Sequence, residues 1–123
     1  MRIVLDSDVI IECLRNNPDF VGRLKSLHLE GHALSYTPIS VAEIHAGLRK
    51  GELESVEAFF QAIQFIPMDR SIGIKAGEYL QKYSKSHFVE LAAAFVAASA
   101  FVHKAHLFTR NKKHYPMKDI EFV

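Results

Sequence analysis

Asp6 is the first residue of the chain whose type and position point to chemistry. It directly follows the apolar run Ile3-Val4-Leu5, which is typical of a buried strand. A carboxylate there is costly unless it is paired, capped or bound to a cation, and hard cations such as Mg²⁺ or Mn²⁺ take carboxylate oxygens. The same pattern also allows Asp6 to cap the following helix, and it favours a capping role even more for Asp8.

Glu43 is the second acid with a possible chemical role. The segment Ser40-Val41-Ala42-Glu43 matches the capping box, in which Ser and Glu satisfy each other's backbone amides. The local pattern favours this role over metal binding. The first turn of a helix favours a carboxylate in either case, so Glu43 also stays a candidate metal-site acid.

The segment His103–Lys118 makes the charge distribution uneven, because it holds five Lys or Arg residues and no acid. Such a stretch could meet phosphates or could be a solvated surface. Within it, Thr109 and Asn111 could hydrogen-bond a phosphate or a metal-bound water, and Tyr115 could stack on a base. The candidate RNA-contacting residues are Ser7, Thr109, Arg110, Lys112 and Lys113.

Composition places the chain among ordinary globular proteins. Its 123 residues suit one domain spanning residues 1–123, and 49% of them are hydrophobic. A net charge of +1 excludes nucleic-acid binding through overall charge alone. Because no apolar run could span a bilayer and no signal peptide is recognisable, we expect a cytoplasmic protein that is not membrane-bound. The single cysteine, Cys13, excludes an internal disulfide, and no histidine has zinc-motif spacing.

Short apolar runs alternate with amphipathic segments, which is typical of an α/β fold with a mostly parallel sheet. The runs that predict strands are 3–5, 33–36, 65–68, 106–109 and 120–123. The segments that predict helices are 9–14, 20–29, 40–48, 53–63, 72–83 and 89–102, with a polar turn at 84–87. Sites in such sheets form outside the carboxyl ends of the strands. We therefore expect Asp6-Ser7-Asp8, Thr37–Glu43 and Thr109–Asn111 to converge.

Four motifs, in this order, resemble those of the PIN-domain toxin ribonucleases (VapC-like) of type II toxin–antitoxin pairs. IVLDSDVII resembles the family's opening strand with its catalytic Asp, and TPISVAEIHAGL resembles the second motif with a catalytic Glu. VELAAAFVAASA and LFTRNKKHY resemble the third and fourth motifs. The resemblance covers Ile3–Val123 and implies a PIN-like α/β/α sandwich around a mostly parallel sheet of about four to five strands.

The resemblance also implies an activity and partners. PIN toxins cut RNA by metal-assisted hydrolysis, in which clustered carboxylates hold divalent ions. By position, Asp6 and Glu43 would be catalytic acids that bind Mg²⁺ or Mn²⁺, and Asn111 would take the fourth position as an amide in place of a carboxylate. The implied partners are an RNA substrate, a second copy in a homodimer, and a cognate antitoxin in the same complex, whose arginine would pair with Asp6 or Glu43.

The third motif departs from the family at Ala93. Alignment of its neighbours puts Ala93 where the family has a metal-site Asp, and alanine can neither bind a metal nor orient a water. The acid was either changed deliberately to make a toxic enzyme harmless or lost in a natural copy. We therefore expect an impaired ribonuclease. Glu90, one helical turn earlier and on roughly the same face, could partly substitute for the missing acid.

Two other functions fit parts of the sequence. A non-catalytic PIN-like module that binds antitoxin or RNA is compatible with Ala93. A phosphatase of the haloacid dehalogenase type is compatible with an Asp-x-Asp pattern after a buried strand, with Asp6 as the nucleophile. The sequence lacks the adjacent acidic pair that such phosphatases need, and 123 residues is short for their fold.

Overall fold

A parallel five-stranded sheet forms the centre of the computed structural model, which describes residues 1–123. Its strands are β1 (Arg2–Leu5), β2 (Ala33–Tyr36), β3 (Gln64–Phe65), β4 (His106–Phe108) and β5 (Glu121–Phe122). They lie in the order β3-β2-β1-β4-β5, and each neighbouring pair is parallel. Because β1 lies between β2 and β4, the residues that follow these three strands meet at one edge of the sheet.

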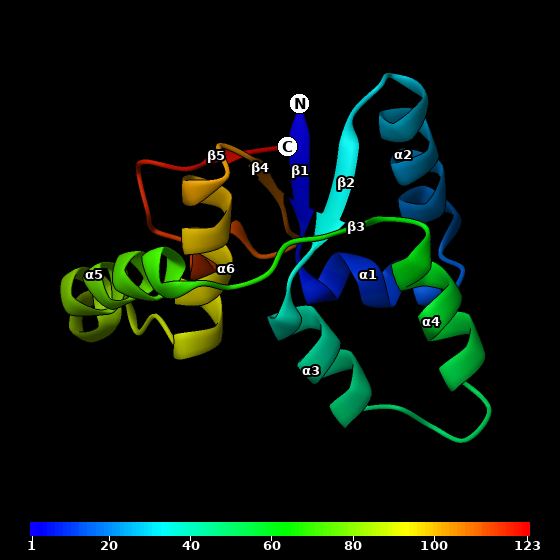
Figure 1. Ribbon diagram of the computed structural model, residues 1–123, viewed down its shortest axis with the longest axis horizontal. Coiled ribbons are helices and arrows are strands. Elements are labelled where there is room, and N and C mark those ends of the chain that lie inside the picture. The colour runs from blue at the N-terminus through cyan, green and yellow to red at the C-terminus, as the bar shows by residue number, and fades with distance from the viewer.

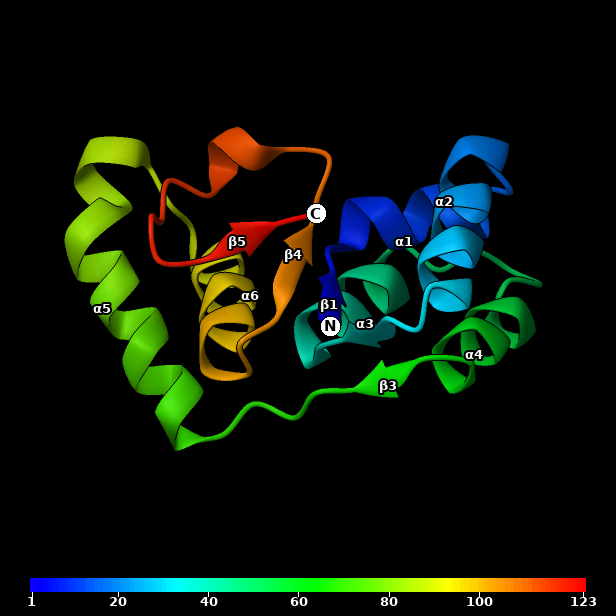
Figure 2. The ribbon, with the colours of Figure 1, turned by 90° about the horizontal axis from the view of Figure 1, so that it is seen from above.

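Helices cover both faces of the sheet (Figure 1). One layer holds α1 (Ser7–Leu14), α2 (Pro18–Leu29), α3 (Pro38–Ala46) and α4 (Leu53–Gln61). The other layer holds α5 (Arg70–His87) and α6 (Leu91–Val102), and a short 3-10 turn, η1 (Lys112–His114), follows β4. Seen from above, α5 and α6 lie together on one side and the four earlier helices gather on the other (Figure 2).

Each face of the sheet has its own hydrophobic core, because side chains alternate along β1. Val4 joins the core under α5 and α6, whereas Ile3 and Leu5 join the core under the four earlier helices. The buried surface of α6 includes four fully buried alanines, namely Ala94, Ala97, Ala98 and Ala100. These small side chains let α6 pack closely against β1 and β4.

The predicted α/β architecture with a parallel sheet is confirmed. The predicted turn at 84–87 is wrong, because α5 continues to His87. Its polar residues are compatible with the exposed end of an amphipathic helix, and the helix ends instead at Phe88, whose φ of 55° lies in the left-handed region. The third strand forms slightly earlier than predicted, at Gln64–Phe65. None of the helices combines the length and the hydrophobicity needed to cross a membrane.

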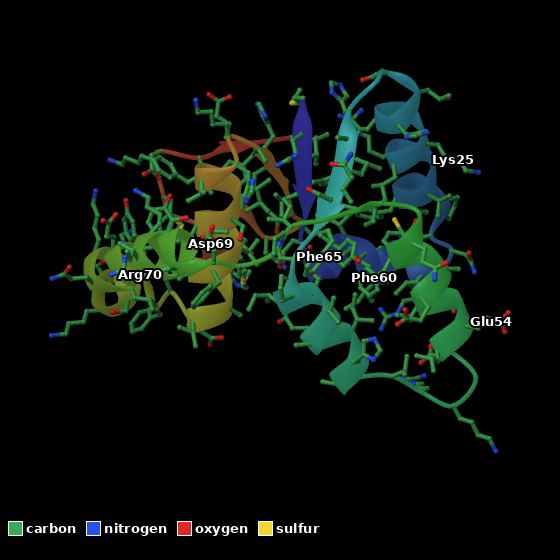
Figure 3. The ribbon with its side chains drawn as sticks, viewed as in Figure 1. Lys25, Glu54, Phe60, Phe65, Asp69 and Arg70 are labelled. Carbon is green, nitrogen blue, oxygen red and sulfur yellow. The ribbon has the colours of Figure 1, made fainter.

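Aromatic packing anchors the edge strand β3 to the sheet. The Tyr36 ring centroid lies 4.4 Å from that of Phe60 and 5.3 Å from that of Phe65. Figure 3 shows Phe60 on α4 and Phe65 on β3. After β3 the chain crosses to the other layer, where Asp69 begins α5 by accepting a hydrogen bond from the backbone N–H of Ile72.

Candidate metal site

An acidic cleft of about 530 Å³ lies at the edge of the sheet where β1, β2 and β4 end. Four acids line it, namely Asp6, Asp8, Glu43 and Glu90, together with two histidines and no lysine or arginine. The acids come from the segment after β1, from α3 and from the start of α6, and Asn111 after β4 lies with them. The predicted convergence of three separated segments is therefore confirmed.

Asp6 is held at both oxygens of its carboxylate. Oδ1 accepts a hydrogen bond of 2.8 Å from the backbone N–H of Ser7, so Asp6 does cap α1 as the local pattern allows. Oδ2 accepts two more, each of 2.8 Å, from the hydroxyls of Thr109 and Tyr115. Three donors, one from the start of α1 and two from the segment after β4, fix the position of this carboxylate and bring no positive charge to it, so it can still bind a cation.

Ser7 connects Asp6 to Glu43. Its hydroxyl donates a 2.7 Å hydrogen bond to Glu43 Oε1, and the Ser40 hydroxyl lies 3.0 Å from the same serine oxygen. Ser7 and Ser40 are both buried. The second oxygen of Glu43 has no hydrogen-bond partner within the protein. Glu43 is thus tied to the end of β1 through one oxygen and keeps the other available to the cleft.

The predicted capping box at Ser40–Glu43 is wrong. The helix begins two residues before Ser40, at Pro38, and its N-cap is Thr37, whose side chain makes no capping hydrogen bond. Proline is well suited to the first helical position because its missing N–H needs no partner there. Ser40 and Glu43 consequently point their side chains at the residues after β1, and neither satisfies a backbone amide of the helix.

Asp8 is not the helix cap that the sequence favours. Its Oδ2 accepts hydrogen bonds of 3.1 Å from the backbone N–H of Arg110 and from Asn111 Nδ2, and it lies 3.4 Å from Thr109 Oγ1. Its Oδ1 is buried and has no hydrogen-bond partner. Burial, and next the negative charge of Asp6, raise the pKa of Asp8 above its ordinary value. The protein thus concentrates negative charge here without an internal cation to balance it.

Tyr115 has a role that the sequence does not reveal. The predicted base-stacking role is wrong for its ring, which is only 6% exposed, and its hydroxyl donates to Asp6. Burial, the charge of Asp6 and this hydrogen bond raise the pKa of Tyr115, and the charges of Asp8 and Glu43 raise it further. Tyr115 therefore stays protonated and acts as a fixed donor to the acidic cluster.

The two sides of the cleft have different compositions. The network wall consists of the lining residues Asp6, Asp8, Asn111 and Tyr115 together with Thr109, which is outside the lining; hydrogen bonds join these five side chains. The α6 wall consists of Glu90, Ala92, Ala93 and Val96. Glu90 precedes the helix in an extended conformation, is exposed, and makes no capping hydrogen bond. Ala93 thus places a methyl group, and no acid, on the cleft.

The candidate RNA-contacting residues fall into two groups. The hydroxyls of Ser7 and Thr109 are buried and donate to carboxylates, so they position acids in this structure. Arg110, Lys112 and Lys113 are exposed and lie outside the cleft lining. The Arg110 guanidinium donates a 2.8 Å hydrogen bond to Glu12. The two lysines carry charge that a phosphate backbone could meet at one side of the cleft.

The donor set suits a divalent cation, although it is incomplete. Carboxylate and amide oxygens are the ligands that Mg²⁺ and Mn²⁺ prefer. Asp8 keeps a buried oxygen without a donor, and no lysine or arginine lines the cleft to pair with its acids. No three Asp, Glu, His or Cys side chains, however, lie close enough together to hold a metal ion. An acid at position 93 would add a carboxylate from the opposite wall.

Known proteins resemble this chain over nearly its whole length. Residues 3–120 match the family model of the PIN domain. Ribonuclease VapC19 of Mycobacterium tuberculosis is 30% identical over 115 residues, which cover 93% of this chain and 92% of that protein.

Two solved structures share the fold. VapBC2 of Rickettsia felis, crystallised with a DNA fragment from its promoter, has a chain that matches with a TM-score of 0.86 and 17% identity, covering 100% of this chain and 98% of that one. A toxin–antitoxin complex from Klebsiella pneumoniae matches with a TM-score of 0.79 and 17% identity, covering 96% and 94%. The α/β/α fold of this chain is therefore one that solved proteins also adopt.

Proposed function

Because this chain belongs to the PIN-domain family, we propose that it is the ribonuclease toxin of a toxin–antitoxin pair, dependent on a divalent cation and impaired by Ala93. The observation that carries the proposal is the cleft, in which four acids converge without a lysine or arginine. The match across residues 3–120 leaves the haloacid dehalogenase alternative without support.

Asp6 and Glu43 are the residues that would hold Mg²⁺ or Mn²⁺, with Asn111 beside them. When bound, such an ion activates a water and neutralises charge on the phosphate under attack. The protein contributes position: Thr109 and Tyr115 fix Asp6, and Ser7 fixes Glu43. Fixed carboxylates need no reorganisation when charge develops on the substrate, which is how preorganised sites lower barriers.

Ala93 is the reason to expect an impaired enzyme. The missing carboxylate removes one negative charge and up to two oxygen ligands from a site that works by surrounding a cation with acids. Metal catalysis contributes several kcal/mol, so its partial loss would lower the rate by roughly a hundredfold or more. A PIN-like module that binds without cutting is the second candidate function, because the same alanine would also suit a chain that has given up catalysis.

Partners follow from charge and from the related proteins. The exposed Lys112 and Lys113 would contact RNA phosphates beside the cleft. The related Klebsiella structure is a toxin–antitoxin complex, and an antitoxin arginine would find unpaired acids in this cleft. We propose a homodimer that binds such an antitoxin. Co-expression with the product of the adjacent gene should yield one complex on a sizing column, and clean separation at micromolar concentration would contradict this part of the proposal.

The test of the enzymatic assignment is Ala93→Asp. RNA cleavage that requires Mg²⁺ or Mn²⁺ should appear or rise about a hundredfold. Ala58→Asp, on the exposed surface of α4, is the matched control, because it adds the same charge away from the cleft. If Ala93→Asp cuts no RNA and a further Asp6→Ala change leaves cation binding unaltered, the ribonuclease assignment fails and the binding module replaces it.

A further inference from the structure

Asn111 poses a problem for the proposed function. The resemblance to PIN toxins implies a carboxylate at position 111. An uncharged amide there gives the cleft one negative charge fewer than the resemblance implies. The structure places a carboxylate directly beside it: Asp8 Oδ2 lies 3.1 Å from Asn111 Nδ2. Both residues line the cleft, although 103 positions separate them in the chain.

The contact between Asp8 and Asn111 settles which way the amide faces. An ionised carboxylate only accepts hydrogen bonds, so the NH₂ group of Asn111 must face Asp8 and its carbonyl oxygen must lie at the other end. That carbonyl oxygen has no hydrogen-bond partner within the protein. Asp8 therefore leaves Asn111 with a free, oriented oxygen, which is the kind of atom that a hard cation binds.

Asp8 is also held in a way that a surface acid is not. The backbone N–H of Arg110 donates to the same oxygen, Oδ2, at 3.1 Å, so two donors from one loop fix the carboxylate. The other oxygen, Oδ1, is buried without any donor. A buried carboxylate oxygen is costly to leave unpaired, and nothing in α1 requires an acid here, since Asp6 already caps that helix.

We infer that Asp8 is a positioning residue for Asn111 and that the two side chains together replace the single carboxylate expected at position 111. Asp8 supplies the negative charge, and Asn111 supplies the oxygen nearer the cation. This inference rests on the proposed function, since it assumes a divalent cation in the cleft. The alternative is a purely structural role, in which Asp8 only links α1 to the 109–111 loop. That role needs the hydrogen bonds but not the negative charge of Asp8.

The test exchanges the two groups. Three variants are compared with the starting chain: Asp8→Asn, Asn111→Asp, and the double variant Asp8→Asn/Asn111→Asp, which keeps the net charge and restores an acid–amide pair in reverse order. Each is titrated with Mn²⁺ by calorimetry and melted in chelator. Asp19→Asn is the matched control, because it removes an exposed acid on α2. The Mn²⁺ readout does not depend on RNA cleavage.

We expect Asp8→Asn to weaken Mn²⁺ binding by about tenfold, because it removes a nearby charge while an amide oxygen can still accept from the loop. Asn111→Asp should melt earlier in chelator, since two carboxylates would then face each other. The double variant should bind Mn²⁺ within about twofold of the starting chain and should recover its melting temperature.

Two results would overturn the inference. One is unchanged Mn²⁺ affinity in Asp8→Asn, which would leave Asp8 with the purely structural role. The other is a double variant that only adds the defects of the single ones, which would show that the residues do not act as a pair. The same variants made in the Ala93→Asp background distinguish a failure of this inference from a failure of the proposed function. If RNA cleavage is absent but Mn²⁺ binding changes as expected, the ribonuclease proposal fails and the inference about Asp8 and Asn111 stands.

Discussion

The network wall and the α6 wall of the cleft depend on different forces. The network wall is polar, and each of its three non-acidic side chains, namely those of Thr109, Asn111 and Tyr115, donates a hydrogen bond to Asp6 or Asp8. The α6 wall is made largely of small apolar side chains that continue the packing of the helix against the sheet. Hydrogen bonds therefore position the first wall, and hydrophobic packing positions the second.

This difference explains why an alanine at position 93 is compatible with an intact site. No donor on the network wall points at Ala93, so the hydrogen bonds that fix Asp6 and Glu43 do not pass through it. Alanine is also the best helix former, and α6 is rich in it. The α6 wall can thus lack an acid while the remaining acids keep their positions. The alanine therefore affects cation binding and catalysis, and it leaves the stability of the fold intact.

The largest effect should come from removing the charge of either Asp6, on the network wall, or Glu43, on α3, in a protein with an acid restored on the α6 wall. In the Ala93→Asp background, Asp6→Asn and Glu43→Gln should each lower RNA cleavage at least about a hundredfold, because each removes a charge from the cation site. Steady-state cleavage at saturating Mg²⁺ measures this. The exposed Glu54 on α4 (Figure 3) provides a control, and Glu54→Gln should cut at the unaltered rate. A Glu43→Gln enzyme that still cuts normally would exclude Glu43 from the site.

Tyr115→Phe tests whether the network wall also stabilises the fold. Loss of the hydroxyl leaves Asp6 Oδ2 with one donor, so the free energy of unfolding at pH 7 should fall by about 1.5–2 kcal/mol. The folded protein raises the pKa of Tyr115, so this contribution is complete below about pH 10 and is lost as pH rises above it. Urea melts at pH 7 and pH 11 should therefore show a smaller difference between the two proteins at pH 11. A constant difference would contradict the assigned hydrogen bond.

Ala93→Asp should destabilise the cation-free protein slightly. A new carboxylate on the α6 wall adds repulsion to the existing acids, which should cost about 1 kcal/mol of unfolding free energy at neutral pH. Saturating Mg²⁺ should recover this loss, because a ligand that binds only the folded state stabilises it. Thermal melts in chelator and in Mg²⁺ measure both effects. Equal melting temperatures under the two conditions would place the new acid outside the cation site.

The smallest effect should follow from Glu90→Gln. Glu90 lines the cleft but is exposed and unbound, so solvent screens its charge. We expect Mn²⁺ affinity to fall by only about twofold at low salt and to be unchanged at high salt. Calorimetric titrations at two salt concentrations measure this. A loss of Mn²⁺ affinity as large as that caused by Glu43→Gln would mean that Glu90 replaces the missing acid directly and that the α6 wall does contribute to cation binding.

The positions of the site residues are predictable from the sequence because parallel strands bring their carboxyl ends to one edge. Asp6, Glu43 and Asn111 follow or flank three such strands, so their convergence needs no knowledge of side-chain packing. The direction of each side chain does need it. Tyr115 looks like a surface residue in a basic stretch, yet the loop after β4 turns it inward to Asp6.

Local patterns mislead where a more distant partner competes for the same group. Ser40 and Glu43 have capping-box spacing, but the helix begins at Pro38, two residues before Ser40. The Ser7 hydroxyl then makes hydrogen bonds with both side chains. Asp8 has the position of a cap in the predicted helix, but α1 begins at Ser7 with Asp6 as its cap, and Asp8 accepts hydrogen bonds from the loop after β4 instead. In both cases the partner lies more than 30 residues away, so no short motif could reveal it.

The most direct test of the central claim is a comparison of Mn²⁺ binding by this chain and by its Ala93→Asp variant. The claim is that the cleft is a divalent-cation site with its network wall intact and one acid missing from its α6 wall. Calorimetry should therefore show binding in the same cleft, abolished in both proteins by Asp6→Asn, with an affinity at least about tenfold higher when Asp stands at position 93. Equal affinities in the two proteins, or binding that survives Asp6→Asn, would contradict the claim.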